Sequence, residues 1–347
     1  MTRVESSIEP EMLMTARTLG FCRRSAAILA CLVVWVAALG LGAAAADRPA
    51  APGNGLADQV VRPSSYPFTF VVFGDSRFTD PRDTRHSSAQ VRQAEMERIA
   101  QERPEFVVIT GDLVFKGDNA RDWQVFDQET QPLRASGARL FPTLGNHDVG
   151  GDRAAALANY FRRFPELKER RWYSVRAGNL MLFALDSTAD DGPGSPQWQW
   201  LENWLAALPP EVDFVLVVPH HPPYTRSTGH MLGGGHSART RETELARMLE
   251  ERQAHMRPRI LVFAGHVHNY ERYQHGGVTY IVSGGGGATP YLFERSPQDF
   301  YHDPGPTYHV CSLTVKPGLL QFRMLKLEFA GHTPQWAVRD SFELKTP

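Results

Sequence analysis

The stretch "FTFVVFGDSRF", Phe68 to Phe78, sets the pattern for the whole chain. An apolar, β-prone run leads into a glycine, then an aspartate, and two residues later an arginine. Such a run is typical of a strand that is buried on both faces of a sheet. Glycine lets the backbone turn sharply where the strand ends and approach a ligand closely. The stretch therefore predicts a buried strand that delivers Asp75 to a site at its C-terminal end.

Four further strand-like runs also end in a polar cluster. They are followed by "GDLV" (111–114), "GNHD" (145–148), "PHHPP" (219–223) and "GHVH" (265–268). Segments with helical patterns lie between them, at 88–102, 119–135, 152–164, 195–205 and 241–253. Strands that alternate with helices predict a layered α/β domain. In such domains, sites assemble where the C-terminal ends of strands meet loops.

The polar residues at these strand ends have metal-binding chemistry. The set comprises two carboxylates, one amide oxygen and three imidazoles: Asp75, Asp112, Asn146, His220, His266 and His268. Oxygen and nitrogen ligands without thiolates suit Mn, Fe or Zn. Six ligands are too many for one tetrahedral ion, but they fit two ions that share a bridging carboxylate and clamp an in-line displacement. A single cluster is typical of a turn or a helix cap, whereas five together predict a function.

The order GD…GD…GNHD…H…GHVH, over residues 74–268, resembles the calcineurin-like metallophosphoesterases. "HHPPY" (220–224) and "GHVHNYER" (265–272) resemble the purple acid phosphatase branch in particular. The resemblance implies a four-layer αββα sandwich of two mixed sheets flanked by helices, with a dinuclear metal site at the C-terminal ends of the strands. It also implies an enzyme that hydrolyses phosphomonoesters or phosphodiesters by attack of a metal-bound hydroxide.

The resemblance assigns roles to the metal-binding set. Asp112 would bridge both ions. One ion would be completed by Asn146, His220 and His266, and the other by Asp75 and His268.

The resemblance also names residues that would face the substrate. His147 would act as general acid or phosphate stabiliser, with Asp148 orienting it. A histidine suits this role because its pKa lies near working pH. His230, ten residues after His220, matches a substrate-facing histidine of the purple acid phosphatase branch. The surrounding loop "YTRSTGHMLGGGH" is expected to act as a lid. Three tyrosines are candidates to line the site, although we expect packing to be the role of at least two of them: Tyr224, Tyr270 and Tyr273.

Two positions depart from the family pattern. Many members carry Asp-x-His in the first motif, where this chain has Arg77. Purple acid phosphatases lack that histidine but supply a tyrosine three residues after the bridging aspartate, where this chain has Phe115. The purple charge-transfer colour should therefore be absent, and the first ion is left with Asp75, Asp112 and His268.

Several interpretations of these departures stay open. In one interpretation, the first ion is bound weakly and water completes its coordination. In another, the site works with one tightly bound ion. Alternatively, Arg77 replaces metal charge by gripping a phosphate oxygen with its planar fork. It could also form an ion pair with a nearby carboxylate such as Asp80 or Asp83. The alternative to an enzyme is a degenerate family member that binds metal or phosphate without turnover.

The N-terminal residues have a different character. Arg23 and Arg24 precede an uncharged run from Ser25 to Ala46, which ends in a small-residue cleavage pattern. We expect residues 1–46 to be a signal peptide, 47–66 a flexible leader and 67–347 a single domain. The protein would then be exported, to the periplasm or outside the cell, unless the run acts as a membrane anchor.

Composition narrows the range of partners. The chain is 42% hydrophobic and 22% charged, as in an ordinary globular protein, and carries a formal net charge of -1. That balance predicts no nucleic-acid-binding surface. We expect a small-molecule phosphate ester or diester as partner, and no stable membrane association once the signal is cleaved. The oligomeric state does not follow from the sequence.

Overall fold

A computed structural model describes residues 57–227, 236–292, 295–303 and 305–347. The expected signal peptide (1–46) and His230 lie outside the described residues. Across the described ranges, no helix is both long and apolar enough to cross a bilayer.

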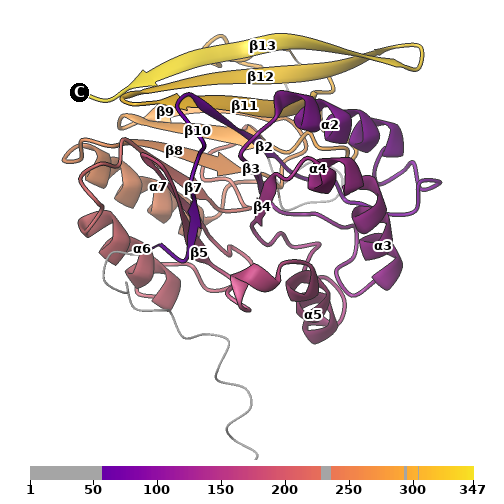
Figure 1. Cartoon of the computed structure of the whole chain (residues 1–347), viewed down its shortest axis with the longest axis horizontal. Helices are drawn as coiled ribbons and strands as arrows, with labels where there is room; N and C mark the ends of the chain where they lie inside the picture. The colour runs from indigo at the N-terminus through magenta and orange to yellow at the C-terminus, as the bar shows by residue number, and fades with distance from the viewer. Residues whose placement is uncertain (1–56, 228–235, 293–294, 304) are drawn as a thin grey trace, which may run out of the picture. The chain divides into compact units, whose positions relative to one another are not determined.

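Two mixed β-sheets form the centre of the fold (Figure 1). The seven-stranded sheet has the order β1 (Gln59–Val61), β5 (Tyr173–Ala177), β6 (Leu180–Ala184), β7 (Phe214–Val218), β8 (Arg259–Ala264), β10 (Val278–Ser283) and β9 (Tyr270–His275). The six-stranded sheet has the order β13 (Thr333–Lys345), β12 (Leu319–Ala330), β11 (Tyr308–Lys316), β2 (Phe68–Phe73), β3 (Phe106–Ile109) and β4 (Arg139–Pro142). Each sheet contains a block of parallel neighbours, β6-β7-β8-β10 in one and β2-β3-β4 in the other.

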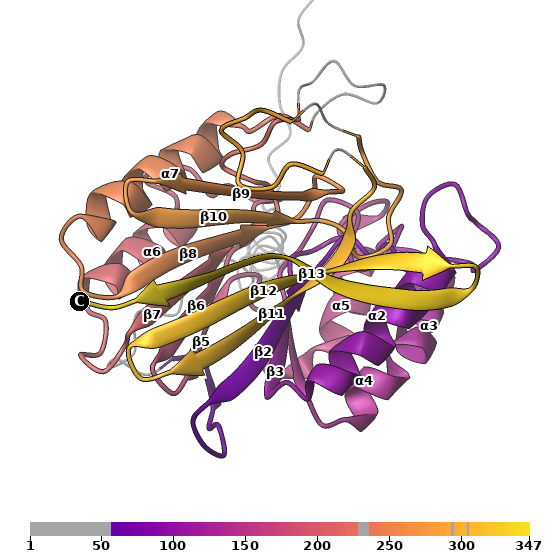
Figure 2. The same cartoon turned by 90° about the horizontal axis from the view of Figure 1, so that it is seen from above.

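Helices cover the outer faces of both sheets (Figure 2). The seven-stranded sheet is covered by α6 (Pro196–Ala206) and α7 (Thr240–Gln253). On the side of the six-stranded sheet lie α2 (Ala89–Glu102), α3 (Ala120–Glu129), α4 (Gln131–Ala135) and α5 (Arg153–Arg163), followed by the short 3₁₀ turn Pro165–Leu167. The prediction of two mixed sheets flanked by helices is thereby confirmed.

The main hydrophobic core lies between the two sheets. It draws apolar side chains from β2, β3 and β11 of one sheet and from β6, β7 and β8 of the other. Phe263 of β8 and Phe322 of β12 face each other across the sheets, with ring centroids 6.2 Å apart. A second cluster lies beneath α6 and α7 and contains four tryptophan and phenylalanine rings: Phe183, Trp198, Trp200 and Trp204. Strands buried on both faces explain the continuous apolar runs of the sequence.

Some elements differ from the expectations. Part of the expected leader, Gln59–Val61, forms β1 and pairs in parallel with β5. The helix expected over 119–135 is divided at Thr130, whose hydroxyl donates to the carbonyl of Phe126. Pro132 follows in the first turn of α4, where its missing N–H breaks no helical hydrogen bond. The start of α6 agrees with the sequence, since Ser195 caps it through the N–H of Trp198.

The core between the sheets predicts a large stability cost for truncation at Phe322. Replacing this buried ring by alanine (Phe322→Ala) should lower the free energy of unfolding by about 3–5 kcal/mol, because a cavity opens where the ring was. Val338→Ala on β13 is the matched control, since Val338 is 50% exposed and its truncation should cost less than about 0.5 kcal/mol. Urea denaturation of both variants measures the difference; equal midpoints would contradict the assignment of this core.

Candidate metal centre

The five polar clusters meet at one edge of the two sheets. Three of them follow the parallel strands β2, β3 and β4, and two follow the parallel strands β7 and β8. Two groups of potential metal-binding side chains result, and within each group the ligand atoms lie within 4.8 Å of one another. We call Asp75, Asp112 and His268 the first group, and His220, His221 and His266 the second group.

The first group combines two carboxylates and an imidazole. His268 Nε2 lies 3.7 Å from Asp75 Oδ1. His268 Nδ1 lies 2.7 Å from the carbonyl oxygen of Thr289. A carbonyl can only accept, so Nδ1 carries the proton and Nε2 presents a lone pair to the group. This Nε2 is buried and has no hydrogen-bond partner among the described residues. Such an orphaned buried acceptor is what a metal ion would satisfy.

The second group converges with Asn146. The side-chain oxygen of Asn146 lies 3.1 Å from His220 Nε2 and 3.0 Å from His266 Nδ1. Asp112 Oδ1 joins them at 3.4 Å from His220 Nε2. His220 Nδ1 lies 2.8 Å from the carbonyl oxygen of Thr110, so Nδ1 carries the proton. The lone pair of His220 is therefore on Nε2 and also faces inward. Four donor atoms from four loops thus surround one point.

The electrostatics of the two aspartates call for a cation. Burial, and after it the charge of Asp112, raises the pKa of Asp75 well above its usual range. Burial alone would also raise the pKa of Asp112. Its electrostatic interactions with the His220 and His147 imidazoles and with the Arg77 guanidinium outweigh that effect and hold the pKa of Asp112 below its usual range. Two buried carboxylates side by side are costly unless cations balance them, and the donor set suits Mn, Fe or Zn. The residues present therefore fit metal ions.

The backbone is strained at the residues that carry these side chains. Asp75, Arg77, Asp112 and His266 all have positive φ, of 58°, 46°, 51° and 69°. Non-glycine residues rarely adopt this conformation, and it clusters at functional sites. Gly145 allows the loops to close, because a Cβ there would lie 2.3 Å from the amide nitrogen of Asp112.

His147 lies beside the centre and is held by main-chain atoms. Its amide donates to Asp112 Oδ1 at 2.9 Å, and its Nδ1 lies 2.6 Å from the carbonyl oxygen of Phe115. The Asp148 carboxylate is directed elsewhere, and accepts from the amides of Leu113, Val114 and Gly145. The structure thus gives the His147 ring a different partner from the one expected, and Asp148 ties the two loops together.

Sequence reasoning passed over His221, a member of the second group. Its Nδ1 lies 2.8 Å from Ser187 Oγ, and its ring centroid lies 4.3 Å from that of His266. The doubled histidine of "HHPPY" was the available signal.

Two further aromatic residues border the centre. Tyr291 stacks on His268 with ring centroids 4.5 Å apart, and its hydroxyl lies 3.0 Å from His236 Nε2. His236 lies 5.1 Å from His266 between ring centroids, at the end of the loop that was expected to act as a lid. Neither residue was predicted from the sequence to belong to the site.

The hydroxyls of the three tyrosines proposed to line the site each donate to a carboxylate. Tyr224 donates to Glu250, Tyr270 to Asp340 and Tyr273 to Glu271.

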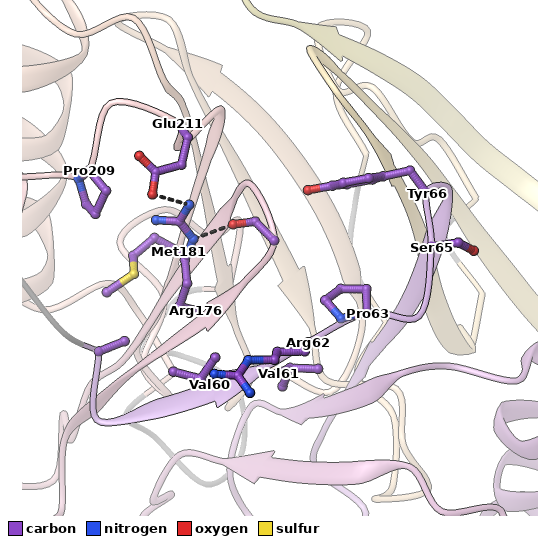
Figure 3. Close-up of a pocket in the computed structure, with 12 residues that line it drawn as sticks. Val60, Val61, Arg62, Pro63, Ser65, Tyr66, Arg176, Met181, Pro209 and Glu211 are labelled. Atoms are coloured by element: carbon purple, nitrogen blue, oxygen red, sulfur yellow. Dashed lines mark hydrogen bonds and ion pairs between the residues drawn. The ribbon is translucent and has the colours of Figure 1, made fainter.

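A pocket of about 520 Å³ lies apart from the centre (Figure 3). Val60, Tyr66 and Met181 contribute to its lining, together with Arg176, which pairs with Glu211 at 3.1 Å. Met181 stands near the N-terminal end of β6, whereas the metal-binding side chains follow the C-terminal ends of strands. The pocket shares no residue with either metal-binding group.

Comparison with known proteins agrees with this geometry. The family model of calcineurin-like phosphoesterases matches residues 68–270. The chain belongs to the calcineurin-like phosphoesterase family. It is 28% identical over 268 residues to a probable purple acid phosphatase 20 of Arabidopsis thaliana, covering 70% of this chain and 56% of that protein. The expected leaning toward the purple acid phosphatase branch is thereby confirmed.

Solved structures share the fold. A purple acid phosphatase from yellow lupin (Lupinus luteus) seeds matches with a TM-score of 0.66 and 20% identity, covering 81% of this chain and 54% of that one. A dimetal phosphatase from Danio rerio matches with a TM-score of 0.54 and 15% identity, covering 81% of this chain and 99% of that one. The chain spans about half the length of the curated relatives it matches.

The centre predicts opposite effects of one isosteric substitution with and without metal. Asp75→Asn removes a buried charge beside Asp112, so the metal-free variant should unfold at a temperature several degrees above wild type. Mn²⁺ or Zn²⁺ in excess should stabilise wild type more than the variant, because the first group loses a donor. Asp80→Asn at the exposed ion pair with Arg82 serves as control and should show neither effect. Thermal unfolding in chelator and in excess metal tests the pattern; a metal-free variant less stable than wild type would contradict it.

Proposed function

We propose that this protein is a metal-dependent phosphoesterase that hydrolyses small-molecule phosphomonoesters or phosphodiesters at the metal centre. The observation that carries the proposal is the position of Asp112, which belongs to the first group and lies 3.4 Å from His220 of the second group, with His147 held beside the same carboxylate. Membership of the calcineurin-like phosphoesterase family supports it.

Two positions for metal ions follow from the side chains. Asn146, His220 and His266 would hold one ion together with Asp112 Oδ1. The first group would offer Asp75, His268 and the other oxygen of Asp112 to a second ion. When bound, Mn, Fe or Zn supplies Lewis acidity that makes water a nucleophile near neutral pH and offsets phosphate charge.

His147 is the proposed proton donor and phosphate stabiliser. Donation from Nδ1 to the carbonyl of Phe115 fixes the ring and leaves Nε2 for the substrate. From there it can hydrogen-bond a phosphate oxygen, or give a proton to the leaving alcohol oxygen. Asp148 contributes indirectly by bracing the loops that hold Asp112 and His147. We propose His230, in a segment outside the described residues, as a further substrate contact.

Export is part of the proposal. It rests on Arg23, Arg24 and the uncharged run that follows them, all outside the described residues. Fractionation of cells producing the full chain tests it. Mature protein that lacks the expected signal peptide, residues 1–46, supports export, and full-length protein retained in the membrane fraction contradicts cleavage.

A non-catalytic metal- or phosphate-binding protein is the competing function. The ion pair between Arg77 and Asp112 favours it, because a protein cation occupies part of the metal-binding carboxylate. Assays of the purified protein with an aryl phosphate and an aryl phosphodiester, under Mn, Zn and Fe supply, decide between the two. Folded, metallated protein with no turnover on either ester would rule out the enzyme.

Substitution of His147 should separate chemistry from metal binding. His147→Ala should lower kcat by about 10²–10⁴-fold, the usual contribution of a positioned acid–base group, while metal content stays at the wild-type value. His332→Ala, at an exposed turn after β12, is the matched control and should leave kcat unchanged. Steady-state kinetics with metal analysis of the same samples measures both quantities. Loss of metal in His147→Ala would instead assign this residue to the metal-binding set.

A further inference from the structure

Arg77 is bound to the metal-binding carboxylate itself. Its Nε and Nη2 lie 3.3 Å and 3.2 Å from Asp112 Oδ2, and its side chain is only 12% exposed. The carboxylates nearer in sequence have other partners: Asp80 pairs with Arg82, and Asp83 with His86. Arg77 is therefore part of the centre.

The two oxygens of Asp112 serve different neighbours. Oδ1 accepts from the amide of His147 and lies 3.4 Å from His220 Nε2, on the side of the second group. Oδ2 accepts two N–H groups of Arg77, whose positive charge also acts on Asp75 and His268 of the first group. The Asp112 carboxylate thus has an imidazole beside one oxygen, Oδ1, and the Arg77 guanidinium beside the other, Oδ2.

This division makes the two halves unequal as metal sites. An ion on the Oδ2 side would share that oxygen with a guanidinium, which cannot lose its proton. Like charges this close repel strongly in a site shielded from water. Asp75 and His268 are the other donors of the first group. On the Oδ1 side, Asn146 and His220 bring neutral donor atoms and no fixed cation.

The backbone holds Arg77 in this place. Its amide donates to the carbonyl of Asp112 at 2.9 Å, and its φ of 46° turns the chain at the end of β2. An uncommon φ at a non-glycine residue persists only where the surroundings fix it. The guanidinium is thus built into the site.

We propose that the centre is asymmetric, with one tightly bound metal ion and one permanent protein cation. The ion is held by Asn146, His220, His266 and Asp112 Oδ1. Arg77 takes the charge role of a second ion and binds the substrate phosphate. The substrate-binding part of this inference rests on the proposed function.

Arg77 has donors to spare for a phosphate. A guanidinium carries five N–H donors in a planar fork, and two nitrogens already face Asp112. Among the residues that the structure describes, its Nη1 has no hydrogen-bond partner. Arginine forks pair with phosphate oxygens through parallel, charge-assisted hydrogen bonds. One guanidinium can therefore hold Oδ2 of Asp112 and a phosphate oxygen at once.

Metal stoichiometry tests the asymmetry without any measurement of turnover. Wild type, saturated with Mn²⁺ or Zn²⁺ and then dialysed, should retain about one ion per chain by elemental analysis. Arg77→His removes the fixed charge and adds a ligand, so it should retain about two. Arg82→His is the matched control, at an exposed arginine, and should retain the wild-type number. Two ions of similar affinity in wild type, or equal stoichiometry in the two variants, would overturn the proposal.

Phosphate binding tests the second part. Inorganic phosphate titrated into the metal-loaded protein should bind Arg77→Gln about tenfold or more weakly than wild type, through loss of a charge-assisted hydrogen bond. Arg77→Lys keeps the charge without the fork and should fall between them. Arg82→Gln should match wild type. Unfolding curves identify any variant that fails to fold, and wild-type phosphate affinity in folded Arg77→Gln would overturn the phosphate role.

These outcomes stay distinct from those of the proposed function. A protein with one tight ion and Arg77-dependent phosphate binding, but without ester hydrolysis, would refute the enzyme and uphold the asymmetric centre. A protein that hydrolyses esters with two equally tight ions would do the reverse.

Discussion

The burial of two carboxylates at one point is the constraint on which the rest of the centre depends. Asp75 and Asp112 are both fully buried and close enough for each charge to disfavour the other. Burial of like charges is tolerated only where donors and cations surround them. The amides of His147 and His266, the Arg77 guanidinium and the inward-facing imidazoles all serve this end. The strained backbone of the strand ends is the conformational cost of bringing them there.

Much of this arrangement was predictable from local sequence. Each site strand is buried on both faces, so it is a continuous apolar run, and its end is marked by a polar cluster, with a glycine before the polar residue in all but the cluster after β7. The parallel order of the strands then brings those ends together, as for Asp75 and Asp112. Some other strands lack this signal. β9 is largely polar, β13 has an exposed face, and β1 is three residues long. Their pairing is set by neighbouring strands rather than by their own composition.

The partners of several site residues could not be predicted, because they are distant in sequence. Asp80 and Asp83 were natural partners for Arg77 by proximity along the chain, yet its partner is Asp112, 35 positions away on the neighbouring strand end. Tyr291 and His236 likewise meet from two loops with no periodicity. The local sequence pattern predicts which residue types follow the C-terminal end of a strand. Which of them touch depends on strand order and loop path, which the pattern does not encode.

The contact between the Phe115 carbonyl and the His147 ring has a consequence for how this position can evolve. It is a main-chain atom that orients His147, so the grip on the imidazole does not depend on which side chain occupies position 115. The ring of Phe115 lies between His86 and His147, at centroid distances of 4.3 Å and 5.4 Å. Phenylalanine and other side chains can therefore be exchanged at this position with the same hydrogen bond in place. Evolution can alter the side chain beside the metal centre at this position without releasing the imidazole that faces the substrate.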